Sequence, residues 1–465
     1  MLQCRRPIPG CSLRAGARGA RRLLVQQFAK LPVSQPVLSP AQFKVRLYRF
    51  PSGAGIIGIV QMPKSDTFPI EIISDKNPTA LGYALLTYMT LVVVAIALIP
   101  FEFNIPSRIQ IYLSGSISDV INNIILFIPI GFLVQLARRR SGWLSLLQAL
   151  GFGVLVSTSV ETCQLFLPGR YCSVIDVATN GLGTWLGAAA AAYLRASRHQ
   201  NQVPSLFAFE MPMMAVVYLL TPLLWLESLS MGAEPARLWL TAVLGVFGSS
   251  VIASVHVNSL GHDRVRGTFP PAVYAAGWFL IGILPSVTAF PLHVSALTAV
   301  VGVVAELVAW FWNRKNPSER RYELPTLKKV FPIYCLYLLL VSVWTTTLPL
   351  GKWIYGLNFG LFTEAQRIVF ISRFIEIIAA FTLLGYMIAA MRGRNKESVL
   401  KMLCWVAGCA LVFSIFTALV RNFITGPFPF VLESSLLTGV SLYGAFIYRL
   451  QLAAVKRLEA LELCA

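Results

Sequence analysis

Long apolar runs separated by short basic gaps dominate this sequence. A helix needs roughly 20 apolar residues to cross the hydrocarbon core of a bilayer. In lipid the backbone must satisfy its own polar groups, which favours helices for runs of this length. The sequence therefore predicts an all-α, polytopic membrane protein with about twelve transmembrane helices. We expect these helices near residues 80–101, 120–137, 143–167, 174–194, 212–230, 237–257, 271–290, 292–312, 330–350, 368–391, 400–421 and 429–449.

The composition agrees with a chain that has lipid as its main solvent. Of its 465 residues, 56% are hydrophobic and only 13% are charged. Soluble domains carry about a quarter charged residues. This balance excludes a disordered chain, a fibrous repeat and an ordinary water-soluble enzyme, and it makes the lipid bilayer the first expected partner.

The net charge of +19 has a distribution that argues against nucleic-acid binding. Residues 1–61 hold ten Lys and Arg residues and no acidic residue, and most other basic residues lie in gaps between apolar runs. Such gaps are richer in Lys and Arg on the cytoplasmic side. The gaps after the even-numbered runs are the basic ones, including Arg138, Arg139 and Arg140. We therefore expect both termini in the cytoplasm and no nucleic-acid partner.

Residues 1–78 form a basic segment that we expect to be disordered. Three interpretations of residues 1–61 remain open at this point. The segment is Arg-rich and acid-poor, as organellar transit peptides are. It also fits a basic tail on anionic lipid. Because the composition becomes ordinary from Met62 onward, we favour a third interpretation, in which 1–61 is translated upstream of the true start.

The cysteines and histidines show no metal-binding pattern. None of the eight cysteines forms a CxxC pair, and the four histidines lie far apart. Structural zinc sites draw on closely spaced pairs of such ligands. We therefore expect no metal and no cofactor.

Polar residues in 119–190 stand where lipid-facing side chains would be expected. Glu161 lies about six residues before the end of its predicted helix, so about 9 Å from that end. Asp176, Asn180, Gly183 and Gly187 follow the spacing of one helix face. An ionised side chain within a bilayer is a candidate functional residue by default. The predicted functional or ligand-binding cluster comprises Asn123, Glu161, Gln164, Arg170, Asp176 and Asn180.

Arg170 is the expected partner of Glu161, which leaves two roles for the cluster. A structural ion pair that locks the turn needs one acid and one base. The sequence gathers two acids, two Asn residues and a Gln residue here. Their number favours a functional site. Small residues let helices approach closely, and the expected packing positions are Pro129, Gly131, Gly169, Gly183 and Gly187.

The stretches "NNIILFIPIGF" and "ETCQLFLPGRYCSVIDVATNGLGTWLG" resemble the VanZ-like family. The family pattern has an Asn before Phe-x-Pro-x-Gly, then Glu with Gln and Gly-Arg, then Asp-x-x-x-Asn-x-x-Gly. The resemblance implies a four-helix membrane domain over 79–196 in a protein of the bacterial envelope, located in the inner (cytoplasmic) membrane. It also disfavours the transit-peptide interpretation. The family is named for a teicoplanin-resistance factor, so the resemblance implies a class and no reaction.

The rest of the chain divides into a middle region and a C-terminal region. Residues 197–329 are expected to form about four helices, whose polar residues are scattered packing or boundary groups: Glu227, His256, Asn258 and Glu306. Residues 330–465 are expected to form four helices. Segments 374–394 and 418–445 resemble 120–140 and 161–188, which sets Gly385 against Gly131 and Gly444 against Gly187. The C-terminal region is therefore a candidate second VanZ-like copy.

This candidate copy has lost most of its polar positions. Ala418 stands where the first copy has Glu161, and Leu437 where it has Asn180. Arg421 replaces Gln164, and Glu433 replaces Asp176. We therefore expect the functional cluster only in the first copy.

Three functions fit these features. The first is a non-enzymatic envelope factor that binds a lipid-linked cell-wall or anionic lipid precursor, or another envelope protein, at the outer face, with a link to glycopeptide resistance. The second is a membrane-embedded enzyme with Glu161 or Asp176 as general base and Arg170 on a phosphate. The third is a secondary transporter, for which a repeat and twelve helices are typical. Because no nucleophile–base pair or metal motif is present, the sequence favours binding over catalysis.

Overall fold

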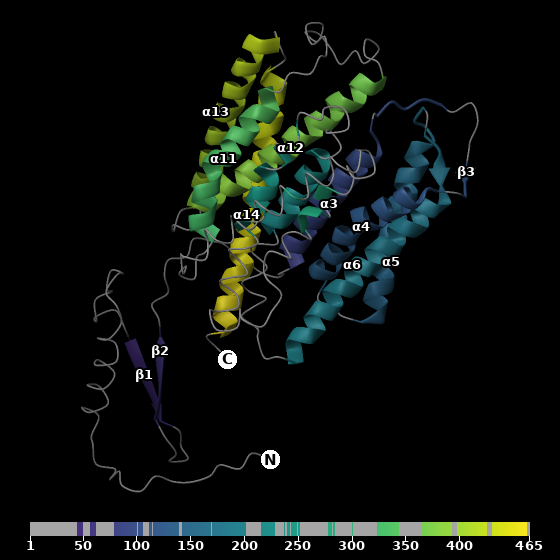
Figure 1. Cartoon of the computed structure of the whole chain (residues 1–465). Coiled ribbons are helices and arrows are strands. Elements are labelled where there is room, and N and C mark those ends of the chain that lie inside the picture. Colours follow the sequence, from purple (N-terminus) through teal and green to yellow (C-terminus); the bar gives the residue numbers. More distant parts are fainter. Residues whose placement is uncertain are drawn as a thin grey trace. The chain divides into compact units, whose positions relative to one another are not determined.

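The computed structural model shows a mainly helical chain (Figure 1). Two units, Met1–Asp75 and Lys76–Ala465, are described separately below. The described residues are 44–49, 56–61, 79–99, 101–105, 111–113, 115–138, 142–168, 170–200, 215–227, short stretches between 237 and 300, 323–343, 364–392, 398–425 and 430–462.

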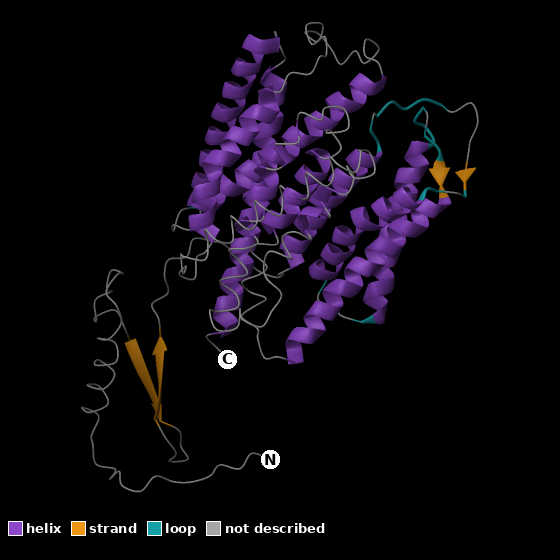
Figure 2. Cartoon of the chain, viewed as in Figure 1, coloured by secondary structure: helices purple, strands orange, loops and turns teal. Residues whose placement is uncertain are grey.

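A β-hairpin is the described part of the first unit (Figure 2). Strand β1, Lys44–Arg49, pairs antiparallel with β2, Ile56–Gln61. Basic and apolar residues alternate in β1, and β2 is rich in β-branched residues, two features that favour strands. The sequence analysis did not anticipate this hairpin, and for the other residues of 1–78 the expected disorder stays a prediction.

Four helices form the first part of the second unit. Strand β3, Ile111–Tyr112, pairs in parallel with β4, Cys172–Ser173. This pairing brings the loop between the first two helices to the start of the fourth. The helices are α3 (Thr79–Ala97), α4 (Ile117–Ala137), α5 (Trp143–Gln164) and α6 (Val174–Gln200).

Helix α4 starts at a capping box. The Oγ atom of Ser116 accepts a hydrogen bond from the backbone N–H of Asp119 at 3.1 Å, and the Asp119 carboxylate accepts one from the Ser116 N–H at 3.3 Å. Reciprocal bonds of this kind satisfy N–H groups that a helix start leaves free. Pro129 lies inside α4 without ending it, and membrane helices tolerate proline in this way.

Glycines allow α4 and α6 to approach to backbone contact. A Cβ atom at Gly131 would clash with the carbonyl of Thr184, and one at Gly183 with the carbonyl of Ile124. A Cβ atom at Gly187 would clash with the carbonyl of Ile128 in the same way. Small residues at membrane helix interfaces serve this purpose. The structure thus places three of the expected packing glycines at this interface, while Gly169 lies outside the described residues.

The last four described helices repeat this packing. Gly385 in α12 meets the carbonyl of Ser441 in α14, as Gly131 meets that of Thr184. Gly444 in α14 meets the carbonyl of Thr382, as Gly187 meets that of Ile128. The four helices are α11 (Glu323–Val343), α12 (Glu364–Arg392), α13 (Val399–Thr425) and α14 (Phe430–Glu462).

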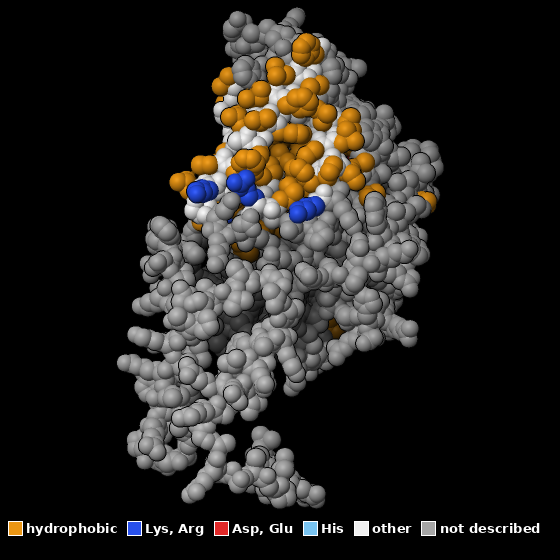
Figure 3. Space-filling view, turned by 90° about the vertical axis from the view of Figure 1, so that its left-hand side faces the viewer, with side chains coloured by type: hydrophobic (Ala, Val, Ile, Leu, Met, Phe, Trp, Pro, Cys, Tyr) orange, Lys and Arg blue, Asp and Glu red, His pale blue; other side chains and the backbone are white. Residues whose placement is uncertain are grey.

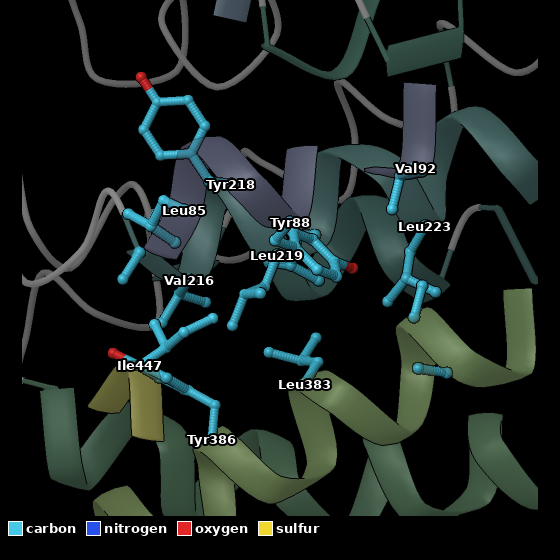
Figure 4. Close-up of a cluster of buried hydrophobic side chains, with 14 of the residues drawn as sticks. Leu85, Tyr88, Val92, Val216, Tyr218, Leu219, Leu223, Leu383, Tyr386 and Ile447 are labelled. Atoms are coloured by element: carbon cyan, nitrogen blue, oxygen red, sulfur yellow. The ribbon is translucent and has the colours of Figure 1, made fainter. Parts of the chain in front are cut away.

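A buried apolar cluster joins the two groups of helices through the middle region (Figure 4). It draws side chains from α3, from the helix Ala215–Glu227, and from α12 and α14. The Tyr443 hydroxyl of α14 donates a hydrogen bond to the Ala84 carbonyl of α3 at 2.7 Å. The labelled members in Figure 4 are Leu85, Tyr88, Val92, Val216, Tyr218, Leu219, Leu223, Leu383, Tyr386 and Ile447.

An apolar surface covers the outer side of the α11–α13 region (Figure 3). Its exposed side chains include Leu336, Val412 and Phe423. Basic side chains gather along one edge of this surface (Figure 3). The guanidinium of Arg392, at the end of α12, lies 4.2 Å from the ring centroid of Trp405 in α13. An apolar band with aromatic and basic residues at its edge is typical of a lipid-facing surface.

Six helices among the described residues are long and apolar enough to cross a membrane. They coincide with the predicted spans near 80–101, 120–137, 143–167, 368–391, 400–421 and 429–449. Helices also cover the predicted spans 174–194, 212–230 and 330–350, over Val174–Gln200, Ala215–Glu227 and Glu323–Val343. The predicted spans 271–290 and 292–312 lie mostly outside the described residues, and the predicted span 237–257 is described in part.

Candidate functional site

Glu161 links the end of α5 to the start of α6. Its side chain is 4% exposed, and its Oε2 atom accepts a hydrogen bond from the backbone N–H of Ser173 at 2.7 Å. The Cys172 thiol forms a further hydrogen bond with this carboxyl group. The positive end of the α6 dipole favours a negative charge at this position. A buried carboxyl group is thereby held by backbone and thiol donors.

Ser173 caps α6 and brings Asp176 into the same cluster. The Ser173 Oγ atom accepts a hydrogen bond from the Asp176 N–H at 3.2 Å. The half-buried Asp176 carboxyl group is hydrogen-bonded to the Ser173 and Asn123 side chains. Asn123 comes from α4, so three of the helices contribute to this site. The carboxyl groups of Glu161 and Asp176 are close enough to interact electrostatically.

Asn180 extends the cluster one turn deeper along α6. Its Nδ2 atom donates a hydrogen bond to the Ser157 Oγ atom on α5 at 2.8 Å. Its Oδ1 atom is buried and accepts no hydrogen bond from a described donor. A buried amide oxygen without a donor is costly, so this atom is available to a hydroxyl or ammonium donor that reaches the cluster.

Gln164 donates its described hydrogen bond to α3 and not to another member of the predicted cluster. Its Nε2 atom donates a hydrogen bond to the Ala97 carbonyl at the end of α3, at 2.9 Å. This bond ties α5 to α3. The described hydrogen bonds therefore give Gln164 a role in holding the helix ends together.

Arg170 lies exposed beside the cluster. Its charge acts on the carboxyl groups of both Glu161 and Asp176. No ion pair within 4 Å joins it to an acidic residue among those the structure describes. Sequence analysis named Arg170 as the partner of Glu161, yet the closest described donor to that carboxylate is the Ser173 amide. The guanidinium therefore remains available to an anion.

The sequence analysis did not single out Ser157, Cys172 or Ser173 as site residues. Ser173, three residues before Asp176, fits the Ser-x-x-acid pattern of a helix start. Ser157 lies one helical turn before Glu161 and so shares its face. Both signals were readable, but only the fold shows that the Ser173 N–H bonds to the preceding helix.

The equivalent end of the C-terminal helices is closed by an ion pair. Arg421 and Glu433 form two hydrogen bonds, one of them at 2.9 Å. Next to Glu433 in the sequence, the Ser434 hydroxyl lies 3.0 Å from the Ser414 hydroxyl. Arg421 and Glu433 stand at the positions of Gln164 and Asp176 in the first group of helices. A charged pair therefore neutralises itself here, whereas the first group leaves Arg170 exposed.

The described residues hold no group of three or more His, Cys, Asp or Glu side chains placed to bind a metal ion. The cluster can instead accept hydrogen bonds through its two carboxyl groups and bind an anion through Arg170. Two carboxyl groups beside an exposed guanidinium suit a ligand that carries both hydroxyl and anionic groups.

Comparison with known proteins identifies the first group of helices. The model of the VanZ/LLP1 family matches residues 70–195. Neither the curated proteins nor the solved structures contain a match to the chain. The matched residues include the whole cluster, from Asn123 to Asn180. The match shows that residues 70–195 form a VanZ-like domain, and the apolar helices make the chain an all-α membrane protein.

Proposed function

We propose that this protein binds an anionic, lipid-linked component of the bacterial cell envelope at the outer face of the cytoplasmic membrane. One observation carries the proposal. Glu161, Asp176 and Asn180 converge at one end of the VanZ-like domain, while Arg170 lies exposed beside them without an ion pair to a described residue. If the Arg170 guanidinium were already paired with a carboxylate, it would bind an anion less well.

The chemistry of the cluster suits a sugar phosphate carried on a lipid. Carboxyl and amide oxygens accept hydrogen bonds from sugar hydroxyls, and a guanidinium binds phosphate with two parallel hydrogen bonds. The lipid chain of such a ligand would lie along the apolar helices. Lipid-linked cell-wall precursors have this chemistry, and their capture would link the protein to glycopeptide resistance.

The state of Cys172 favours binding over nucleophilic catalysis. Burial and the neighbouring carboxyl group of Glu161 raise the pKa of the Cys172 thiol. The reactive form of cysteine is the thiolate. A thiol held protonated beside two acids is a hydrogen-bond donor, and it serves here to position Glu161.

The proposal includes twelve transmembrane helices and cytoplasmic termini. The basic residues Lys328, Arg392 and Lys401 lie near the start of α11, the end of α12 and the start of α13. Arg138 lies at the end of α4. By the bias of cytoplasmic loops toward Lys and Arg, these ends face the cytoplasm. The Glu161 cluster, at the other ends of α4 and α5, then faces outward.

A second VanZ-like copy in the C-terminal helices is part of this proposal. Two pairs of equivalent glycines support it. Gly131 and Gly385 each meet a carbonyl of the facing helix, and so do Gly187 and Gly444. In this copy the Arg421–Glu433 pair replaces the open cluster. We therefore assign ligand binding to the first copy and a packing role to the second.

Binding to purified protein in lipid nanodiscs tests this function. The probes are a lipid-linked cell-wall precursor and phosphatidylglycerol, compared by native mass spectrometry. We expect Glu161→Gln and Arg170→Met each to weaken precursor binding about tenfold or more, which corresponds to roughly 1.4 kcal/mol. Glu433→Gln is the matched control and should bind normally. Equal binding of both probes, or normal binding by both cluster variants, would refute the proposal.

The same variants give a cellular test. Cells that lack the gene, and cells that carry each variant at equal protein level, are compared for teicoplanin susceptibility. We expect Asp176→Asn to behave like the deletion and Glu433→Gln to behave like the wild type. An equal loss in both variants would contradict the assignment to the first copy.

A further inference from the structure

Exposed apolar side chains lie at the end of the VanZ-like domain that holds the Glu161 cluster. They belong to the chain between α3 and α4, described at 101–105 and 111–113, and to the turn between α5 and α6. Ile105 is 93% exposed and Leu113 is 75% exposed, so the fold leaves them uncovered. We call these residues the apolar rim, which comprises Phe101, Phe103, Ile105, Ile111, Tyr112, Leu113, Phe166 and Tyr171.

Hydrogen bonds and ring contacts hold the apolar rim against the helix ends. The Asn104 N–H donates to the Phe166 carbonyl at 2.6 Å, which ties the chain after α3 to the end of α5. Strands β3 and β4 lie side by side (Figure 2) and place Tyr112 opposite Ser173. The ring centroids of Tyr112 and Tyr171 lie 4.4 Å apart. The rim is therefore a built part of the domain.

The apolar rim is continuous with the Glu161 cluster through β4. Ser173, which lies opposite Tyr112 in the strand pair, donates its N–H to the Glu161 Oε2 atom. The exposed Arg170 directly precedes Tyr171 in the chain. The polar cluster thus has an apolar border along β3 and along the turn between α5 and α6.

Two physical limits decide where this rim lies. A large exposed apolar patch is rare on a protein surface in water and marks contact with a partner or a membrane. Irregular backbone cannot face the hydrocarbon, because its N–H and C=O groups would lack hydrogen-bond partners there. The headgroup layer satisfies both limits, and Tyr side chains are enriched in it. The rim also directly follows α3 and α5, which are long and apolar enough to cross a membrane.

We propose that the apolar rim lies in the phospholipid headgroup layer, so that the Glu161 cluster opens toward the membrane surface and not toward bulk water. The position of the rim needs no ligand. Its consequence for binding rests on the function proposed above: a lipid-anchored anion would reach Arg170 by moving sideways within its own membrane. The site would thereby favour lipid-linked ligands over soluble molecules with the same polar groups.

Photo-crosslinking of the full chain in phosphatidylglycerol nanodiscs, without any precursor, tests this position. Benzoylphenylalanine, which keeps an aromatic ring, replaces Tyr112 or Tyr171, and lipid adducts are measured by mass spectrometry after irradiation. We expect adduct yields close to that at Leu155, which is exposed on α5, and several times that at Phe127, which is buried in α4. After ester hydrolysis, adducts at the two tyrosines should retain glycerophosphate more often than those at Leu155.

Replacement at Ile105 gives a further position in the rim, where the high exposure leaves few contacts to lose if a tyrosine variant fails to fold. Adducts at Leu155 without adducts at the rim would overturn the proposal. Cross-links from the rim to a second copy of the chain, in place of lipid, would also overturn it. Because no precursor is present, lipid adducts at the rim would support the proposal even if precursor binding failed, and precursor binding without such adducts would refute the rim position alone.

Discussion

At the scale of single residues, Glu161 shows how a carboxyl group is kept within an apolar domain without an ion pair to any residue that the structure describes. Its hydrogen bonds come from the Ser173 amide and the Cys172 thiol. The free N–H groups at a helix start are natural partners for a carboxylate. The capping serine of α6 thus uses its hydroxyl within its own helix and its amide on the preceding one. This division of donors orients Glu161 without using Arg170.

This geometry predicts that Glu161 variants separate stability from function. Glu161→Gln keeps an oxygen that accepts from the Ser173 N–H, so the unfolding temperature in detergent should change little. Glu161→Leu removes the acceptor and should cost about 1–3 kcal/mol of stability. Thr162→Leu, at the exposed neighbour, is the control. Equal destabilisation by Gln and Leu would show that the negative charge itself holds the fold.

The same residues show what sequence alone could predict of the site. The identities of Asn123, Glu161, Asp176 and Asn180 and their common end of the domain follow from helix spacing. Their hydrogen-bond partners do not follow from it, because from sequence alone an acidic residue is matched with the nearest basic residue. The bond from Ser173 to Glu161 depends on how α6 starts after the turn, and that start is set by the β3–β4 pairing.

At the scale of helices, glycine positions determine how α4 and α6 pack. A side chain at Gly187 or Gly444 would overlap a carbonyl of the facing helix. Gly151 and Gly408, each 36 residues earlier, face open space. These crowded and open glycines therefore occupy equivalent positions in the two groups of helices. Neither apolarity nor charge would produce this agreement, which is why it supports a shared origin.

The close contacts predict paired effects of substitution. Gly187→Val and Gly444→Val should each lower the unfolding temperature and the amount of protein in the membrane, because overpacking costs about 1–3 kcal/mol or more. Gly151→Ala and Gly408→Ala should have little effect. For each of the four variants, the amount of protein in the membrane and the unfolding temperature in detergent are measured. Normal stability of either Val variant would show that its helix pair can separate.

At the scale of the whole molecule, the middle region connects the two groups of helices. The helix Ala215–Glu227 contributes to the apolar cluster with α3, α12 and α14, and Arg237 pairs with both Glu227 and Glu376. The sequence predicted the helices before and after the middle region well, since long apolar runs suffice to predict membrane helices. It could not predict the contacts of Arg237, because its partners Glu227 and Glu376 lie 10 and 139 residues away along the chain.

The orientation of the whole protein is the prediction on which the outward position of the Glu161 cluster depends. Arg138 at the end of α4 and Arg392 at the end of α12 lie at basic helix ends, and such ends stay on the cytoplasmic side. A reporter fused after residue 140 or after residue 396 should therefore be cytoplasmic, while one inserted at 169–172 should be external. Removing the positive charges at 138–140 serves as the control, because it should weaken the first result and leave the one at 396 unchanged. An external reporter after residue 140 in the otherwise unaltered protein would place Glu161 and Arg170 on the cytoplasmic side, where they would meet precursors before export instead of after it.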